Sequence, residues 1–199
     1  DILRKKVEIG SRVFVRRSNE VIPEILGLAE KTENSQPIIE PEYCPSCGEK
    51  LIHIGALEFC PNTYGCKEQV VDRIRHFATR DAMNIEGFSE QTASLLYDEY
   101  HIDNVAKLYT LTKEMLCSLP LFKDKKAEKM INAIQKSKNA KLENFIYALG
   151  ISGVGKKTAK DLAKHFGTYE NIKNATLEEL TNIKDVGEII TQNIKEFFD

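Results

Sequence analysis

Residues 149–157 read Leu149-Gly150-Ile151-Ser152-Gly153-Val154-Gly155-Lys156-Lys157, a glycine-apolar-glycine turn between two segments with helical periodicity. Apolar residues recur three and four positions apart on both sides of the turn, from Leu142 to Leu149 and from Ala159 to Phe166. The stretch therefore predicts a helix, a tight hairpin and a second helix. Glycine permits a positive φ in such a hairpin and keeps side chains away from the backbone amides.

The start of the second helix has the properties of an anion site. Its first backbone N–H groups have no partner within the helix, and the helix dipole favours negative charge there. Because lysines follow the hairpin directly, a nucleic-acid phosphate is the expected anion. The predicted contact residues are Gly153, Val154, Gly155, Lys156 and Lys157. For one isolated hairpin, an ordinary glycine helix end followed by a new helix is an equally good interpretation.

The hairpin has three counterparts in the chain. Its apolar tip Val154 corresponds to Phe88, Phe122 and Val186, and the successive tips are 34, 32 and 32 residues apart. Such a period indicates tandem copies of one structural unit. The predicted fold is mainly α-helical, with four helix-hairpin-helix repeats arranged as two tandem pairs.

The four hairpins differ as phosphate sites. The third hairpin has a glycine on both sides of its tip. The first hairpin has a serine in place of the glycine after its tip, and the second hairpin has a lysine at that position. The fourth hairpin keeps only the glycine after its tip. Charge near the second hairpin can compensate for the missing glycine, although a solvated helix face is the alternative for its lysines. The further predicted contact residues are Gly87, Phe88, Gly187, Lys123, Lys125 and Lys126.

Four cysteines form the most specific chemical pattern in the chain. Two residues separate Cys44 from Cys47, twelve residues follow, and five residues separate Cys60 from Cys66. Two such pairs can supply the tetrahedral sulfur shell of a structural zinc ion, which leaves no open position for water. We therefore predict a four-cysteine zinc finger with a structural Zn²⁺.

Residues next to the cysteines support this prediction. Gly48 permits a turn after the first pair, and Asn62 and Gly65 can form a looser turn within the second. The fifth cysteine, Cys117, lies outside the cluster between Leu116 and Leu119. We expect Cys117 to be a small buried residue.

The first 30 residues have the pattern of β-strands. Residues 11–17 alternate apolar and basic residues, and residues 21–25 continue as a second strand that Pro23 confines to an edge or a bend. Two strands rarely stand alone, so we expect the last strands of a small OB-type barrel in a chain that is a piece of a longer one. Arg16 and Arg17 either contact phosphate or lie on a solvated strand face. The expected domains are residues 1–40 for strands and linker, 41–70 for the zinc finger, and 71–199 for the repeats.

The composition limits the class of protein. The chain of 199 residues is 42% hydrophobic and 29% charged, and it contains neither an apolar run of membrane-spanning length nor a signal-peptide pattern. A cytoplasmic protein with no membrane partner is expected. The formal net charge is −2, so nucleic-acid binding must depend on local basic patches.

The order of these parts resembles the central and C-terminal region of bacterial NAD-dependent DNA ligases, over essentially the whole chain. The motifs that carry the resemblance are Cys44-Pro-Ser-Cys47-Gly48, Arg75-His76-Phe77 through Arg80-Asp81-Ala82-Met83, and the stretches 133–138 and 145–151. The chain departs from the family's Arg-Ala-Gly-Asp-Val-Ile-Pro strand at Ser18, Asn19 and Glu20, and from its second hairpin at Lys123.

The resemblance implies a parent enzyme that seals nicks in duplex DNA in replication and repair. In this family a lysine takes AMP from NAD, the AMP passes to the 5′ phosphate, and the 3′ hydroxyl displaces it with assistance from Mg²⁺. The Lys-x-Asp-Gly motif that contains this lysine does not occur in these residues. NAD and Mg²⁺ are therefore expected to act through other domains, and the fragment alone is expected to have no catalytic residue and no activity.

The expected role of the fragment is to bind nicked double-stranded DNA as a monomer, through the backbone and without sequence specificity. The alternative is a non-catalytic helix-hairpin-helix scaffold from a DNA-repair complex.

Overall fold

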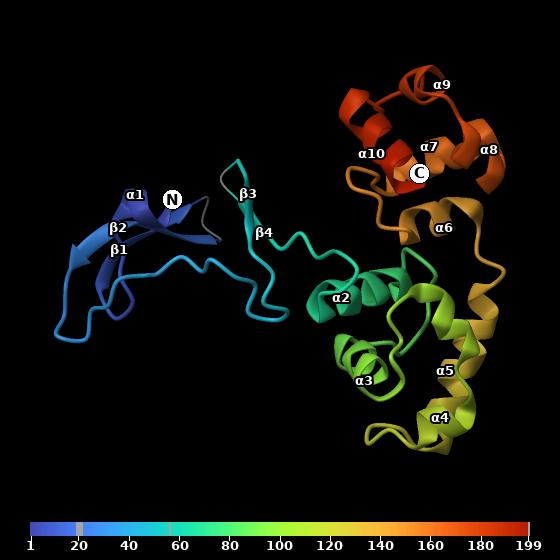
Figure 1. The fold of residues 1–199 in the computed structure, drawn as a ribbon, viewed down its shortest axis with the longest axis horizontal. Helices are drawn as coiled ribbons and strands as arrows, with labels where there is room; N and C mark the ends of the chain where they lie inside the picture. Colours follow the sequence, from blue (N-terminus) through green and yellow to red (C-terminus); the bar gives the residue numbers. More distant parts are fainter. Residues whose placement is uncertain (19–21, 56, 199) are drawn as a thin grey trace. The chain divides into compact units, whose positions relative to one another are not determined.

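The computed structural model describes residues 1–18, 22–55 and 57–198 (Figure 1). The chain divides into two compact units, one of residues 1–44 and 49–59 and the other of residues 45–48 and 60–199. This division runs through the expected zinc finger, so the domain boundaries at residues 40 and 70 stay a prediction. In the described ranges, no helix combines the length and the apolar character needed to cross a membrane.

The described residues of the first unit form a short helix and two antiparallel strand pairs. The elements are α1 (Ile2–Lys5), β1 (Arg12–Ser18) paired with β2 (Ile22–Glu30), and β3 (Ile52–Ile54) paired with β4 (Leu57–Phe59). The second predicted strand is thus present and continues to Glu30. Asn19, Glu20 and Val21, which were predicted to belong to this region, lie outside the described residues. The assignment of β1 and β2 to a barrel stays a prediction.

The first unit has little buried apolar surface of its own. Among its described residues only Cys44 is buried, and large side chains such as Phe14 and Val15 on β1 are 61% and 57% exposed. A small unit without a hydrophobic core needs another source of stability, such as a bound metal or a packing partner.

The second unit is helical. Its elements in chain order are α2 (Lys67–Ala78), α3 (Glu90–Tyr100), the 3₁₀ helix η1 (Val105–Thr110), α4 (Lys113–Cys117), α5 (Asp124–Ser137), α6 (Leu142–Ala148), α7 (Lys156–Phe166), α8 (Tyr169–Asn174), α9 (Leu177–Thr181) and α10 (Glu188–Phe198). The predicted, mainly α-helical fold is confirmed.

Two hydrophobic cores divide the helical unit between its repeats. The first core is built mainly from α2 to α5 and includes Ile74 and Leu96, whereas the second includes Leu162 of α7. The short helix α6 joins them, because Ala148 belongs to the first core and Ile146 to the second. Figure 1 shows the corresponding groups of helices, α2 to α5 in green to yellow and α7 to α10 in orange to red. Each core belongs to one tandem pair of repeats.

Polar contacts also join the two tandem pairs. The ring nitrogen Nε2 of His76 on α2 lies 2.9 Å from the carbonyl oxygen of Tyr147 on α6, and the two rings meet edge to face. The side-chain amide of Asn144 donates a hydrogen bond to the carbonyl of Asp81 at 2.8 Å. The junction is therefore a packed contact as well as a chain connection.

Cys117 is exposed, so the prediction that it is buried was wrong. It is the last residue of α4, and the preceding Leu116 is fully buried. Successive residues of an α-helix point about 100° apart, because one turn contains 3.6 residues. The apolar neighbours of Cys117 indicated a core nearby but could not show which of two adjacent residues lies inside it.

The helix α9 begins with a capping box. The Thr176 hydroxyl accepts a hydrogen bond from the Glu179 amide at 3.2 Å, and the Glu179 carboxylate accepts one from the Thr176 amide at 2.7 Å. These bonds to the backbone and the hydroxyl of Thr176 lower the pKa of Glu179. The carboxylate therefore stabilises the fold at pH values above its ordinary pKa of 4.5, and this contribution is lost as the pH falls through the lowered folded-state pKa.

We expect Thr176→Ala to lower the free energy of unfolding by about 1 kcal/mol at pH 7, because α9 loses its N-cap hydroxyl. Urea denaturation followed by circular dichroism measures this change, with Thr176→Ser, which keeps the hydroxyl, as the control. The difference in the free energy of unfolding between Thr176→Ala and the wild type should decrease as the pH falls and Glu179 is protonated. Equal stabilities at pH 7 would contradict the role of the cap.

Candidate nucleic-acid interface and metal centre

Turns with one shared hydrogen-bonding pattern stand at all four predicted hairpins. In each turn the amide of the apolar tip donates to the carbonyl three residues earlier. The bonds are Phe88 to Ile85 at 3.3 Å, and Phe122 to Leu119, Val154 to Ile151 and Val186 to Ile183 at 3.0 Å each. The helices α3, α5, α7 and α10 begin two residues after these tips. The predicted repetition is therefore confirmed at the level of the backbone.

Three of the four turns have a left-handed residue just before the tip. The φ angle is +78° at Gly87, +80° at Gly153 and +65° at Asp185. This conformation is typical of the third residue of a type II turn and favours glycine. Leu121, at the same place in the second hairpin, has no positive φ. The second hairpin thus departs from the others at Leu121 as well as at Lys123.

The third hairpin leaves the start of its helix open. Gly155, the N-cap residue of α7, makes no side-chain cap hydrogen bond, and a Cβ added to it would meet nothing within 4 Å. In the first hairpin, by contrast, the hydroxyl of Ser89 accepts the Thr92 amide at 3.2 Å. Gly187, directly before α10, also has open space at its Cβ position. The amides in the first turn of α7 can therefore donate to an acceptor outside the protein, whereas one amide in the first turn of α3 already donates to Ser89.

The apolar tips point inward. Val154 is 6% exposed and belongs to the second core, and Phe88 packs against the first core. Their side chains therefore anchor the hairpins, and the predicted contact of these two residues with phosphate has to come from the backbone.

Lys156 and Lys157 each pair with an aspartate far away in the sequence. The partner of Lys156 is Asp81 and that of Lys157 is Asp185, and all four side chains remain at least half exposed. The hydrogen bond from Lys157 lowers the pKa of Asp185 and raises the pKa of Lys157. Sequence reasoning missed both aspartates as partners. The alignment of the repeats could have drawn attention to Asp185, since this aspartate in the fourth hairpin aligns with Gly153 in the third.

The lysines of the second hairpin lie at the start of α5. Lys123 and Lys125 are exposed. The Nζ atom of Lys126 donates to the Leu121 carbonyl at 3.1 Å and lies 4.3 Å from the centroid of the Phe122 ring. Lys126 is thus oriented by the turn itself, whereas Lys123 is the N-cap residue of α5 and provides no cap hydrogen bond.

The two strand arginines are exposed on β1. Arg16 forms an ion pair of 3.0 Å with Glu24, its cross-strand neighbour on β2. Its charge is therefore partly balanced within the protein. The contact of Arg16 and Arg17 with phosphate stays a prediction.

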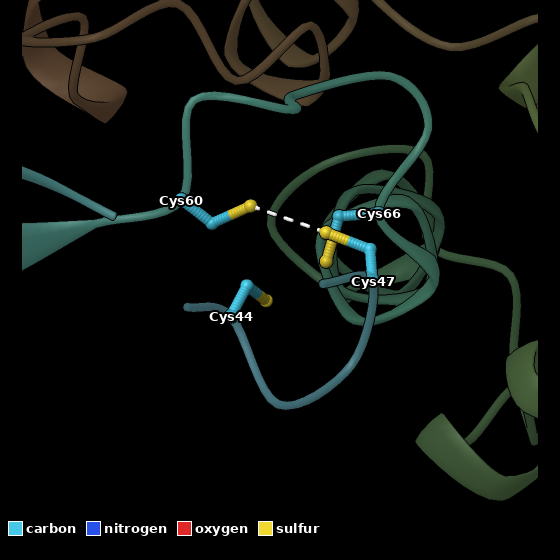
Figure 2. A group of neighbouring side chains, drawn as sticks. All are labelled: Cys44, Cys47, Cys60 and Cys66. Carbon is cyan, nitrogen blue, oxygen red and sulfur yellow. Dashed lines mark hydrogen bonds between the residues drawn. The ribbon is translucent and has the colours of Figure 1, made fainter. Parts of the chain in front are cut away.

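The four cysteines that were predicted to bind zinc come together, and Figure 2 shows their side chains converging. All four sulfur atoms lie within 4.8 Å of one another, and those of Cys47 and Cys60 are 3.5 Å apart. A tetrahedral shell with Zn–S bonds of about 2.3 Å places sulfur atoms about 3.8 Å apart. The cluster could therefore hold a metal ion in a closed shell of four sulfurs.

Tight turns bring the cysteines to these positions. Gly48, after the first pair, has a φ of +74°, and the amide of Cys44 donates to the carbonyl of Glu49 at 2.7 Å. In the second turn the amide of Gly65 donates to the side chain of Asn62 at 2.9 Å. A Cβ on Gly65 would lie only 2.5 Å from this Asn62 oxygen, so any other residue there would displace the Asn62 side chain from its hydrogen bond.

The helix α2 fixes the loop that contains the last two cysteines. Cys66 is its N-cap residue and is buried. From the same helix, Gln69 donates to the Cys60 carbonyl at 2.8 Å and Arg73 donates to the Thr63 carbonyl at 2.7 Å. The loop is thus positioned by protein contacts around the cluster.

Comparisons with known proteins agree with the repeats. The family described as SAM-like helix-hairpin-helix tandem matches residues 79–136, and the family described as helix-hairpin-helix motif matches residues 144–199. The chain is 56% identical to DNA ligase 2 of Clostridium acetobutylicum, 55% identical to a DNA ligase of Clostridium tetani and 51% identical to a DNA ligase of Alkaliphilus oremlandii. Each alignment covers 100% of this chain and 30% of the relative.

Proposed function

Because this chain is homologous over its whole length to a segment of bacterial DNA ligases, we propose that it is the duplex-binding part of an NAD-dependent ligase that seals nicks. In this proposal it contacts the DNA backbone without reading the base sequence. NAD and Mg²⁺ act through other parts of the enzyme, and this segment alone does not ligate.

The observation that carries this proposal is the open start of α7 at the third hairpin. Gly155 provides no cap, so the first amides of the helix can donate to phosphate oxygens. Lys156 and Lys157 add positive charge beside them and can exchange their aspartate partners for phosphate. Such contacts determine the position of a duplex but carry no sequence information, which suits an enzyme that acts at any nick.

In the proposed function the four-cysteine cluster holds a structural zinc ion. Cys44, Cys47, Cys60 and Cys66 would occupy all four positions of a tetrahedral Zn²⁺, which would then act by holding these turns together. Since the first unit has little buried apolar surface, metal binding would stabilise the segment around β3 and β4.

A non-catalytic repair scaffold with paired hairpins is the competing function. It would explain residues 79–136 and 144–199, where the helix-hairpin-helix families match. The alignment with DNA ligases extends through residues 1–78 as well, which favours the ligase.

Fluorescence anisotropy with labelled nicked and intact duplexes over a salt series tests the proposal. We expect the same affinity for duplexes of unrelated sequence, and a plot of log K against log salt with a slope of about −3, as three to four phosphate contacts would give. Absence of binding at about 50 mM salt, or binding that does not depend on salt, would contradict the proposed function.

A further inference from the structure

The internal duplication allows the two tandem pairs to be compared position by position. Aligning Phe88 with Val154 places Gly87 opposite Gly153. Aligning Phe122 with Val186 compares α5 with α10 and matches Lys126 with Ile190, Lys129 with Asn193 and Met130 with Ile194. The last match is supported by burial, since Met130 and Ile194 are both core residues.

In the second tandem pair the hairpin is packed against α10. The side-chain amide of Asn193 donates to the Ser152 carbonyl at 3.0 Å. The Cγ1 atom of Ile190 lies 3.0 Å from the position that a Cβ on Gly153 would occupy. Ile190 and Asn193 thus close the space between the third hairpin and the helix.

In the first tandem pair the corresponding space is a cavity. The nearest neighbour of a Cβ on Gly87 would be the Cε atom of Met130, at 3.9 Å. A cavity of about 490 Å³ lies between the first hairpin and α5, and its lining includes Glu86, Gly87, Lys126, Lys129 and Lys136. We call it the lysine cleft.

The charges of the lysine cleft favour an anion. Lys126, Lys129 and Lys136 line it together with a single carboxylate, Glu86. In the part of the chain that the structure describes, the side-chain ammonium groups of Lys129 and Lys136 have no ion-pair or hydrogen-bond partner, unlike that of Lys156. The positive charge of these ammonium groups exceeds the negative charge of the one carboxylate, and Gly87 has no side chain to block access. Such a site is suited to a phosphate.

We propose that the lysine cleft binds neighbouring phosphates of the DNA backbone, with Lys126 and Lys129 on separate phosphates, so that the first tandem pair contacts DNA mainly through side chains of α5. This inference rests on the proposed function and deepens it. It also accounts for Ser89, whose hydroxyl accepts a hydrogen bond from an amide of α3. The corresponding amide of α7, at the third hairpin, has no side-chain cap and is open to a phosphate. The lysines near the second hairpin then act together with the first hairpin.

Introducing the residues of the second tandem pair into the first tests the proposal. We expect Lys126→Ile with Lys129→Asn to weaken duplex binding about tenfold at low salt and to reduce the salt slope by about two, one for each lost phosphate contact. Lys173→Asn on α8 removes an exposed charge outside the cleft and should leave the affinity unchanged. Its single-charge counterpart Lys129→Asn should reduce the slope by about one.

Circular dichroism and thermal melting show whether each variant is folded, and Lys129→Asn decides the question if the double variant is not. An unchanged affinity and slope in a folded cleft variant, with normal binding by the wild type, would overturn the lysine cleft and leave the proposed function intact. No binding by the wild type would overturn both. A titration with inorganic phosphate, followed through the Lys129 amide by NMR, distinguishes a site for free phosphate from a site for DNA. If inorganic phosphate still saturates the cleft in the presence of excess duplex, the proposal is overturned.

Discussion

Gly155→Asp is expected to remove most of the affinity for duplex DNA while the protein stays fully folded. The aspartate carboxylate would cap α7 and accept the hydrogen bonds that we propose for a phosphate, and its charge would repel the backbone. The loss of charge-assisted hydrogen bonds is worth about 2 kcal/mol, or about 30-fold in Kd. Gly155 has a φ of −80° and open space at its Cβ position, so the substitution causes no strain.

Anisotropy and thermal melting of the same samples measure the two effects separately. Gly155→Ala, which adds a Cβ but no acceptor, serves as the control and should bind almost as well as the wild type. Gly153 is unsuitable for this test because its φ of +80° and its contact with Ile190 would make a loss of binding indistinguishable from strain. Wild-type affinity in a folded Gly155→Asp protein would show that the amides of α7 do not contact DNA.

Cys44→Ser is expected to reduce bound zinc from one ion per chain to well below one. Three thiolates and a hydroxyl form a much weaker shell than four thiolates, and structural zinc sites have apparent binding free energies of about 10–16 kcal/mol. Since the first unit has little buried apolar surface, the segment around β3 and β4 should lose its protection from hydrogen exchange when the ion is lost.

Metal analysis after dialysis against a zinc buffer gives the stoichiometry. Cys117→Ser is the matched control, because this exposed cysteine lies outside the cluster and its loss should leave one ion bound. The helices of the second unit, which have their own cores, should keep their protection in both variants. A full zinc content in Cys44→Ser would exclude the four-sulfur site.

The hairpins could be predicted from the sequence because their backbone demands particular residues. Gly87 and Gly153 have a positive φ that other residues adopt with strain, and the regular spacing of the tips repeats this demand. The cysteine spacing predicted the cluster for a similar reason, since short turns such as the one at Gly65 aim two sulfurs at one point.

Contacts between distant helices could not be predicted in this way. The pairing of Lys156 with Asp81 joins residues 75 positions apart, and nothing in the local pattern of either residue indicates it. The lysine cleft likewise could not be predicted locally. It exists because α5 has no side chains that fill the space beside Gly87 as Ile190 and Asn193 of α10 fill the space beside Gly153. Lysines at 126, 129 and 136 do share a helical face, which is the sequence signal for it, but a solvated surface has the same pattern.

The short helix α6 also determines how the two tandem pairs respond to curvature in a bound duplex. Ile146 and Ala148 are two residues apart on this helix, yet they belong to different cores, and His76 holds α6 from the side of the first pair. Tilting one pair would therefore disturb the packing of both. If both pairs contact one duplex, the shape of the DNA has to match the arrangement of the pairs that α6 fixes, and a duplex that must be deformed to match it binds less tightly.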